Sequence, residues 1–326
     1  MLKKVVITQP LPDERLIELT GQCNLEVLSG SQSLSDACMR DELATCQGLI
    51  CLLTDRIDRP LLDAMPQLEF VSSVSVGVDH IDVQALTRRH IPVGHTPGVL
   101  VDTTADAAFA LLLAAARRVA EGDRFIREGN WCSENRWSPD FFLGKDVSGA
   151  TLGIIGLGAI GQAVARRASG FDMRVIGWTP SGREVPGVEN VSLEALLLRS
   201  DFVSVHLARS STTRNLLDSA KIATMKPGAV LVNTARGGIV NELALARALD
   251  SGHIYAAGLD VFEHEPVAMD NPLLQHPRVV VVPHLGSATT LTRARMLDIA
   301  VCNAVAALQG KYMPHCVNPE VYPLAL

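Results

Sequence analysis

A glycine-rich segment in the middle of the chain constrains the fold more than any other feature. Residues 152–155 have the pattern of a short buried strand, and residues 160–168 have the apolar spacing of a helix. Between them, Gly156, Gly158 and Gly161 match G-x-G-x-x-G in the strand–turn–helix context that the motif requires. The first glycine permits the tight turn, the second lets a pyrophosphate approach the backbone, and the third lets helix and strand pack closely. Another apolar strand follows the helix, so we predict dinucleotide binding rather than a purely structural turn.

The composition limits what surrounds this segment. The chain has 326 residues, enough for two domains, and its 48% hydrophobic and 20% charged content suits buried cores rather than disorder. The longest purely apolar run, residues 107–116, is shorter than the roughly 20 residues that a membrane span needs. The net charge of −6, without a basic cluster, argues against nucleic acid and anionic membranes as partners.

The cysteines and the start of the chain bear on location. The seven cysteines are scattered, without a C-x-x-C pair, which suits free thiols in a reducing cytoplasm better than disulfides or a metal site. The chain enters a strand-like segment directly, without the features of a signal peptide. We therefore expect a cytoplasmic protein without a bound metal.

Strand-like and helical segments alternate along the first hundred residues, which predicts a parallel sheet covered by helices on both faces. After the fourth strand, Gly77 lets the backbone present N–H groups to a ligand such as a carboxylate. The alternative is an ordinary strand-ending turn in which Asp82 caps the next helix. The expected strands are residues 5–8, 25–28, 48–53, 70–75 and 91–94, and the expected helices are residues 13–19, 36–45, 60–64 and 82–89.

The middle of the chain contains an apolar helix and an aromatic loop. Residues 101–122 read as one long helix that is apolar almost all round, opened by a capping signal at Asp102. Such a helix must be buried between domains or between subunits, so we expect a domain boundary near residue 100 and an oligomer. The loop at residues 129–150 carries Trp131 and Trp137, which suit an interface or the rim of a site. The alternative is a pair of packed surface rings.

A second alternating series follows and predicts a doubly wound nucleotide domain over residues 100–286. Its apolar runs are nearly continuous, as expected for a parallel sheet covered on both faces. A helix is expected at residues 288–309. The expected strands are residues 152–155, 174–178, 202–206, 229–233, 256–261 and 279–282.

The end of the second strand of this series bears on which dinucleotide binds. An NAD site usually has Asp or Glu there, whose carboxylate accepts hydrogen bonds from the adenosine ribose. Here Thr179 takes that place, and Glu184 comes too late to replace the acid. Thr179 and Ser181 are able to donate hydrogen bonds to a 2′-phosphate, and Arg183 is able to pair with it. We therefore predict a preference for NADP(H), with NAD(H) as a second cofactor. The alternative is a solvated turn in a weakly discriminating site.

Three side chains suited to catalysis follow later strands of the series: Arg236, Glu265 and His284. Because ligands of open α/β sheets bind outside the carboxyl ends of the strands, we expect the three to converge. An Arg suits a carboxylate or carbonyl oxygen, a His suits proton transfer, and a carboxylate beside that His orients it. Each also has a structural alternative: a salt-bridge partner, a solvated turn residue and a core histidine, respectively.

With these motifs in order, nearly the whole chain resembles the D-isomer-specific 2-hydroxyacid dehydrogenases, and most closely their glyoxylate/hydroxypyruvate reductase branch. Several motifs in family order are far more specific than any one of them. Besides the glycine turn, the resemblance covers CLLTD (51–55), SVGVDH (75–80), HTPGVLVDTTAD (95–106), NTARGG (233–238), GLDVFEHEP (258–266), PHLGSAT (283–289), ALQGK (307–311) and CVNP (316–319).

The resemblance implies two doubly wound, parallel-sheet α/β domains of the Rossmann-like type with the active site in the cleft between them. One is a discontinuous substrate-binding domain of residues 1–99 and 287–326, and the other is a dinucleotide-binding domain of residues 100–286. It implies that Arg236, Glu265 and His284 form the catalytic set, with Glu265 rather than Glu263 because the catalytic acid immediately precedes a proline.

It also implies the residues that line the site. The implied substrate-binding residues are Leu53, Val76, Gly77, Trp137, Arg236 and Ser287. The implied cofactor-binding residues are Thr104, Gly156, Gly158, Ala159, Ile160, Gly161, Thr179, Ser181, Arg183, His206, Leu207, Thr213, Thr234, Ala235, Asp260, His284 and Gly286.

The implied reaction is hydride transfer between a nicotinamide and a small 2-oxo acid, which converts glyoxylate or hydroxypyruvate to glycolate or D-glycerate. The implied assembly is a homodimer in which the neighbouring subunit contributes Trp137. One alternative is a dehydrogenase of 2-ketogluconate or another D-2-hydroxyacid that uses NAD(H). Another, from a different class, is a non-catalytic, dinucleotide-sensing protein like the corepressors built on this fold, because these can keep the same Arg, Glu and His.

Overall fold

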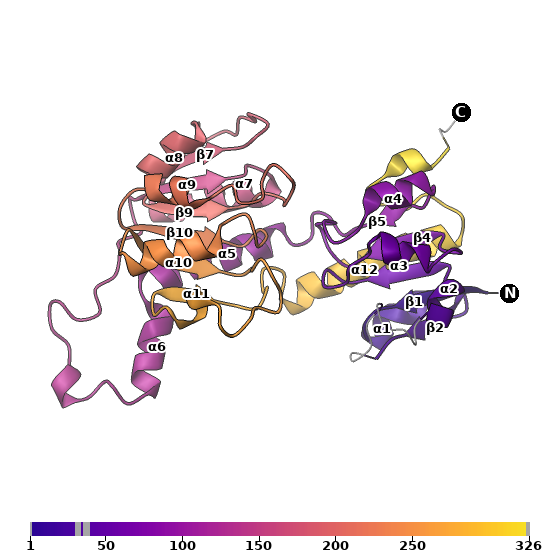
Figure 1. Ribbon diagram of the computed structural model, residues 1–326, viewed down its shortest axis with the longest axis horizontal. Helices are drawn as coiled ribbons and strands as arrows, with labels where there is room; N and C mark the ends of the chain where they lie inside the picture. Colours follow the sequence, from indigo (N-terminus) through magenta and orange to yellow (C-terminus); the bar gives the residue numbers. More distant parts are fainter. Residues whose placement is uncertain (1, 30–33, 35–39, 324–326) are drawn as a thin grey trace. The chain divides into compact units, whose positions relative to one another are not determined.

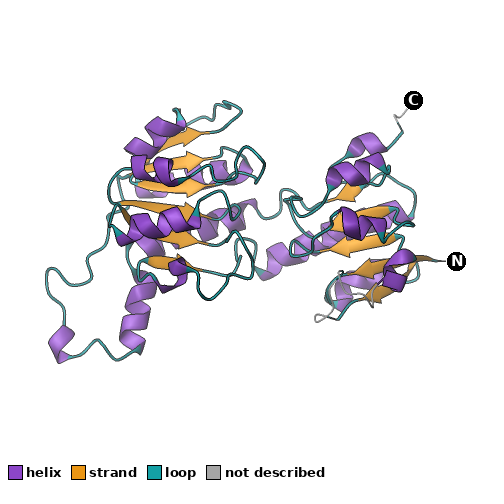
Figure 2. Cartoon of the chain, in the orientation of Figure 1, coloured by secondary structure: helices purple, strands orange, loops and turns teal. Residues whose placement is uncertain are grey.

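The computed structural model describes residues 2–29, 34 and 40–323, which form two compact units (Figure 1). The first unit combines Met1–Leu100 with Thr289–Leu326, and the second is the contiguous segment Val101–Ala288. In each unit, helices lie on both faces of a layer of strands (Figure 2). Strand pairing is parallel throughout both sheets in the described residues. The prediction of two parallel α/β domains, one of them discontinuous, is therefore confirmed.

The first unit contains, within the described residues, a five-stranded sheet in the order β2-β1-β3-β4-β5. Side chains of β1 alternate between two cores: Val6 packs with α3 and α4, whereas Val5 and Ile7 pack with α12. A strand buried on both faces requires this alternation. The elements are β1 (Lys3–Ile7), α1 (Asp13–Leu16), η1 (Ile17–Leu19), β2 (Cys23–Val27), α2 (Arg40–Ala44), β3 (Gly48–Cys51), α3 (Arg59–Asp63), β4 (Phe70–Ser73), α4 (Val83–Arg88), β5 (Val93–Gly94), α12 (Thr290–Leu308) and η5 (Pro319–Val321).

The helix α12 comes from the far end of the chain and covers one face of this first sheet. Thr289 caps it by accepting a hydrogen bond from a backbone N–H of the first turn. Met296 and Ala300 then pack against the sheet together with Phe70 of β4. The expected helix at residues 288–309 is thus present, and it completes the core of the unit that contains the N-terminus.

The second unit contains, within the described residues, a seven-stranded sheet in the order β12-β11-β10-β9-β6-β7-β8. Along β10, Ala229 and Leu231 pack in a core with α8 to α10, and Val230 and Val232 pack in another with α5 and α7. The elements are α5 (Val101–Ala116), α6 (Val119–Arg127), η3 (Ser133–Asn135), β6 (Thr151–Ile155), α7 (Ala159–Ala168), η4 (Ser169–Phe171), β7 (Arg174–Trp178), β8 (Glu189–Asn190), α8 (Leu193–Arg199), β9 (Phe202–Val205), α9 (Ser219–Thr224), β10 (Ala229–Asn233), α10 (Glu242–Asp250), β11 (Ile254–Leu259), α11 (Pro272–Gln275) and β12 (Val279–Val281).

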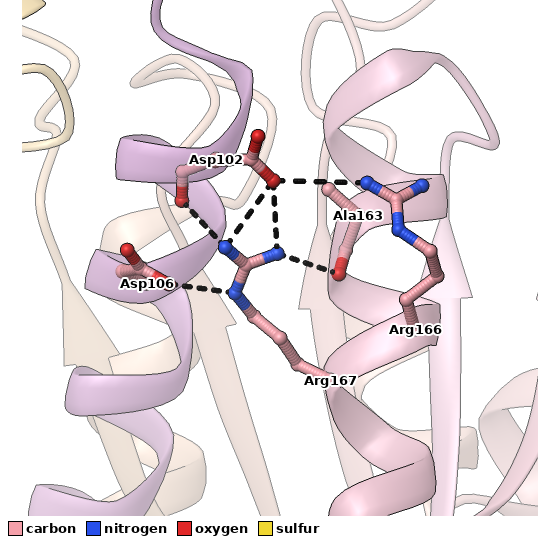
Figure 3. Close-up of polar contacts among 5 residues, drawn as sticks. All are labelled: Asp102, Asp106, Ala163, Arg166 and Arg167. Carbon is pink, nitrogen blue, oxygen red and sulfur yellow. Dashed lines mark hydrogen bonds and ion pairs between the residues drawn. The ribbon is translucent and has the colours of Figure 1, made fainter.

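Helices α5 and α7 are joined by an ion-pair cluster at the start of α5 (Figure 3). The Arg167 guanidinium of α7 pairs with Asp106 at 2.7 Å and with Asp102 at 3.3 Å, and it also donates to the Ala163 carbonyl oxygen. Asp102 therefore lies inside the first helical turn and binds Arg167, which corrects its predicted role as a cap. Because both carboxylates are exposed, each pair is worth at most about 1 kcal/mol.

The prediction of one helix over residues 101–122 is wrong. The backbone of Arg118 is left-handed, with φ 55°, so the chain turns there and a separate helix, α6, begins. The Arg118 side chain fixes this turn by pairing with Glu121 at 2.6 Å and by lying over the Phe142 ring. The predicted burial of this helix between domains or between subunits also needs correction, because α5 is buried against the sheet of its own unit.

The segment from α6 to residue 145 extends away from the sheet of the second unit, and we call it the arm (Figure 1). No residue of α6 is buried. The arm exposes two tryptophans, Trp131 and Trp137, the latter to 77%. Three of its rings pack against one another: Phe125, Phe141 and Phe142.

Smaller differences from the sequence-based prediction are local. Residues 36–39 of one expected helix lie outside the described residues, and α2 begins at Arg40. The two-residue strand β8 was not predicted, because its exposed Glu189 and Asn190 lack an apolar signal. No helix in the described part of the chain is long and apolar enough to cross a membrane.

Candidate active site

The three glycines of the central turn differ in what surrounds them. Gly156 has φ 103°, and a Cβ there would lie 2.6 Å from the His206 carbonyl oxygen. A Cβ on Gly161 would lie 2.0 Å from the Gly156 carbonyl oxygen. At Gly158, in contrast, a Cβ would meet nothing within 4 Å. The first and third glycines are therefore required by the fold, whereas the second keeps a space open at the N-terminus of α7.

This turn and its neighbours fit a polar ligand such as a dinucleotide. Helix α7 begins without a side-chain cap, so its first N–H groups remain available. Two buried polar atoms that follow neighbouring strands, His206 Nδ1 and Thr234 Oγ1, lack a hydrogen-bond partner within the described residues. Burial lowers the pKa of His206 to about 4, so its ring is neutral, with Nε2 2.8 Å from Ser204 Oγ. Native proteins rarely leave such atoms unpaired, and a bound ligand would satisfy them.

The turn that follows β7 contains the residues predicted to select the dinucleotide. A hydrogen bond of 3.0 Å from the Gly182 N–H to the Thr179 carbonyl oxygen closes it. Ser181 and Arg183 are exposed, and the Arg183 guanidinium has no ion-pair partner within the described residues. The cation is thus available to an anion at this edge of the sheet.

The predicted acid/base pair is in contact. His284 Nδ1 lies 2.8 Å from Glu265 Oε2, and the other oxygen of Glu265 accepts from the Phe262 N–H at 2.9 Å. His284 itself has a left-handed backbone, with φ 54°, and its N–H bonds to the Asp260 carbonyl oxygen at 3.0 Å. Because Nδ1 is engaged by the carboxylate, Nε2 is the ring atom left for proton exchange.

The electrostatics keep Glu265 ionised. Its side chain is 29% exposed, and its partial burial alone would raise the pKa. The hydrogen bonds from His284 and Phe262 and the charge of Arg236 outweigh burial and lower the pKa of Glu265 below its usual value. A carboxylate that stays charged stabilises a protonated imidazole beside it.

Arg236 is carried by a tight turn after β10. The Asn233 side chain holds this turn: it accepts from the Ala235 N–H at 3.0 Å and donates to the Arg236 carbonyl oxygen at 3.0 Å. A Cβ on Gly237 would lie 1.8 Å from the Phe262 carbonyl oxygen, so the turn lies directly against the segment that precedes Glu265. The sequence-predicted trio therefore comes together within one unit.

Asp260 lies beneath the histidine turn. Its carboxylate accepts from the Leu285 N–H and, at 2.8 Å, from the Gly286 N–H. Burial raises its pKa, and these two donors oppose the rise. Asp260 thus fixes the turn that carries His284, in addition to any contact with a cofactor.

The other predicted residues are spread over both units. In the second unit, Thr104 and Ser287 are buried, and a Cβ on Gly286 would lie 3.4 Å from Thr104 Cγ2. The Thr213 hydroxyl is already engaged, since it donates to the Ala208 carbonyl oxygen at 2.8 Å and accepts from a backbone N–H. Leu207 packs beside the glycine turn, and Trp137 stands on the arm.

Leu53, Val76 and Gly77 belong to the first unit, where all three lie in loops at the carboxyl ends of strands. Asp82 caps α4 by accepting a hydrogen bond from the Ala85 N–H at 2.8 Å, as predicted by the alternative of an ordinary strand-ending turn. The cap does not replace the functional interpretation, because the Val76 and Gly77 N–H groups have no hydrogen-bond partner within the described residues.

Sequence reasoning missed the backbone donors of the site. The Phe262 N–H and the Leu285 N–H orient Glu265 and Asp260, and neither has a side-chain signature that a motif could reveal. No group of three or more His, Cys, Asp or Glu side chains in the described chain could hold a metal ion.

A dinucleotide-type glycine turn and an imidazole–carboxylate pair beside a guanidinium, all at strand ends of one sheet, define a nicotinamide-dependent oxidoreductase. Comparison with known proteins agrees: residues 109–286 match the family model "D-isomer specific 2-hydroxyacid dehydrogenase, NAD binding domain". The chain belongs to the D-isomer-specific 2-hydroxyacid dehydrogenase family, in its glyoxylate reductase branch. The sequence-based identification is thereby confirmed.

The relatives cover essentially the whole chain. A glyoxylate reductase of Korarchaeum cryptofilum is 45% identical over 98% of this chain and 97% of its own length. The TT0316 protein of Thermus thermophilus superposes with a TM-score of 0.90 at 43% identity and covers 96% of this chain and 99% of its own. An NADPH-dependent glyoxylate/hydroxypyruvate reductase of Sinorhizobium meliloti, solved with NADP and malonate, has a TM-score of 0.87 at 30% identity, with 100% of both chains covered.

Proposed function

We propose that this protein reduces glyoxylate and hydroxypyruvate to glycolate and D-glycerate with NADP(H) as the preferred cofactor. The observation that carries the proposal is the contact of 2.8 Å between His284 Nδ1 and Glu265 Oε2, in the same unit as the glycine turn. We assign dinucleotide binding to the second unit and substrate binding to the first. The names of the relatives support the substrate class.

The chemistry of this chain's own residues is that of an acid/base pair with an electrophilic partner. In reduction, His284 gives a proton from Nε2 to the carbonyl oxygen of the 2-oxo acid, while Glu265 holds Nδ1 and stabilises the charged ring. Arg236 polarises that carbonyl and helps to hold the substrate carboxylate, together with the N–H groups of Val76 and Gly77. Bound NADPH supplies the hydride.

The first experiment measures initial rates of NADPH and NADH oxidation with glyoxylate, hydroxypyruvate and 2-ketogluconate in parallel. We expect NADPH to be consumed fastest, and with the two small acids. If 2-ketogluconate alone is turned over, the proposed substrates are wrong and 2-ketogluconate takes their place. No turnover with any pair, despite dinucleotide binding, would favour a binding protein and overturn the enzymatic proposal.

The cofactor preference depends on the Thr179 turn. Thr179→Asp places a carboxylate where we expect the 2′-phosphate, so it removes one hydrogen bond and adds repulsion. We expect the ratio of kcat/KM for NADPH to that for NADH to shift about tenfold or more toward NADH. Thr224→Asp, which adds the same charge to an exposed position of the same unit, is the control. An unchanged ratio in Thr179→Asp would refute the assignment.

We also propose that the arm forms a homodimer contact, through which Trp137 reaches the substrate of the neighbouring subunit. The support is the large apolar surface that this chain leaves open on the arm, including Val119, Ile126 and Trp131. Light scattering after gel filtration should give about twice the chain mass of 35.0 kDa for the wild type. Ile126→Asp should shift the mass toward the monomer, whereas Met269→Asp, at an exposed residue off the arm, should not. Equal masses for both variants would contradict the contact.

A further inference from the structure

We propose that Ser75 and His95 are positioning residues that orient two of three consecutive peptide planes, the third being held by the Thr96 N–H, so that the N–H groups of Val76, Gly77 and Val78 together receive the carboxylate of the substrate. The proposal rests on the proposed function, in which Val76 and Gly77 hold that carboxylate. It adds a role for two side chains that hydrogen-bond the carbonyl oxygens of this loop and so orient its N–H groups.

The backbone carbonyl oxygens of residues 75, 76 and 77 each accept a hydrogen bond from a separate donor. The Ser75 carbonyl oxygen accepts from the Thr96 N–H at 2.8 Å. The Val76 carbonyl oxygen lies 3.0 Å from His95 Nδ1, and the Gly77 carbonyl oxygen accepts from the hydroxyl of Ser75 at 2.8 Å. Since a carbonyl oxygen only accepts, Nδ1 of His95 carries the proton in this contact.

These three bonds determine where the next N–H groups point. The only cis peptide bond among the described residues is Glu265-Pro266, so the loop's peptide planes are trans. In a trans plane, the C=O of one residue and the N–H of the next point in opposite directions. With the carbonyls of residues 75–77 tied to the unit, the N–H groups of residues 76–78 face away from it. None of the three has a hydrogen-bond partner within the described residues. Successive backbone N–H groups left unpaired on one side of a loop are the kind of group from which anion-binding concavities are built.

The Ser75 hydroxyl is itself held in one direction by a relay. Ser75 has a single hydroxyl proton, and it donates that proton to the Gly77 carbonyl oxygen. Ser73 Oγ, 2.7 Å away, must therefore donate to Ser75, and it accepts in turn from His80 Nε2 at 3.1 Å. Ser73 and Ser75 are buried, which strengthens each bond of the relay.

His95 is anchored to the core of the unit through α12. Its N–H donates to the His315 carbonyl oxygen at 3.0 Å, and its carbonyl oxygen accepts from Asn303 Nδ2 at 3.1 Å. Asn303 is fully buried, and its Oδ1 accepts from the His315 N–H at 3.0 Å. The imidazole thus projects from a fixed backbone. A site held this way before the substrate arrives loses little entropy on binding.

The test compares variants that remove a tie with variants that keep it. Ser75→Ala and His95→Leu each release one carbonyl, whereas His95→Asn keeps a donor, Nδ2, near the position of Nδ1. The matched control is Ser72→Ala, which removes a buried hydroxyl bond of the same length, 2.8 Å to the Ala300 carbonyl oxygen, on the opposite side of β4. Glyoxylate KM and kcat, the affinity of the enzyme–NADPH complex for malonate by calorimetry, the Kd for NADPH and the melting temperature are measured for each.

We expect Ser75→Ala and His95→Leu to raise the glyoxylate KM and weaken malonate binding about tenfold, as for loss of an oriented bond to a charged group. We expect kcat and the NADPH Kd to stay within about twofold, because the carboxylate is held equally in the ground and transition states. We expect His95→Asn to resemble the wild type, and Ser72→Ala to lower the melting temperature without changing KM.

Unchanged KM and malonate affinity in folded Ser75→Ala and His95→Leu would overturn the proposal, and so would an equal rise in Ser72→Ala. If the wild type binds malonate but turns over no 2-oxo acid, the proposed function fails. The malonate affinities of the variants then still decide whether Ser75 and His95 orient the loop.

Discussion

Replacing His284 with alanine should lower kcat for glyoxylate reduction by about 10²–10⁴-fold and leave the affinity for NADPH within a few-fold. The expected loss is that of a positioned general acid. Glu265 holds Nδ1 of the His284 ring at 2.8 Å. A water molecule that enters the space left by the ring lacks the fixed position and the positive charge of the protonated imidazole. The measurements are steady-state rates and NADPH fluorescence titration.

Two further variants separate the acid from its surroundings. His264→Ala removes an exposed histidine next to Glu265 in the sequence and should leave kcat near that of the wild type. Glu265→Gln keeps the size of the side chain but removes the charge that stabilises the protonated ring, so its kcat should fall between those of the wild type and His284→Ala. Near-normal turnover in His284→Ala would refute the acid/base role.

The second large effect concerns the glycine that keeps open space. Gly158→Ala should weaken binding of NADPH and of NADH about 10- to 100-fold, because its Cβ would stand where the pyrophosphate approaches the backbone. The fold should be unaffected, since Gly158 has φ −70° and a Cβ there meets nothing within 4 Å. Calorimetric titration and thermal unfolding measure the two quantities.

Gly156→Ala is the contrasting variant of the same turn. Its Cβ would lie 2.6 Å from the His206 carbonyl oxygen on a backbone with φ 103°. The free energy of unfolding should therefore fall by about 2–5 kcal/mol, and binding should weaken with it. If Gly158→Ala binds dinucleotide as tightly as the wild type, the pyrophosphate does not approach this glycine.

The sequence predicted much of the fold, because both sheets are built from apolar runs separated by turns. Gly156 and Gly161 were informative because a Cβ at either position would clash with a backbone carbonyl oxygen, so only glycine fits there. The break at Arg118 could not be predicted, because it depends on a partner ring, Phe142, far along the chain. The exposed strand β8 carried no apolar signal.

The same distinction applies to the candidate site. Arg236, Glu265 and His284 stand out because few side chains perform their chemistry and all three follow predicted strands. The groups that hold them are largely backbone atoms, such as the Phe262 N–H, whose positions depend on folded geometry. His95 and Ser75 were part of recognised motifs, yet only the hydrogen bonds connect them to the loop they orient.

The position of α12 has a consequence for the order in which the chain is made. Ile7, Ile50 and Phe70 share a core with Met296 and Ala300, so one face of the first sheet stays only partly covered until α12 leaves the ribosome. The second unit is contiguous and has all of its residues by Ala288. The unit that is begun first during synthesis is thus completed last. Its sheet lacks α12 while all of Val101–Ala288 is made.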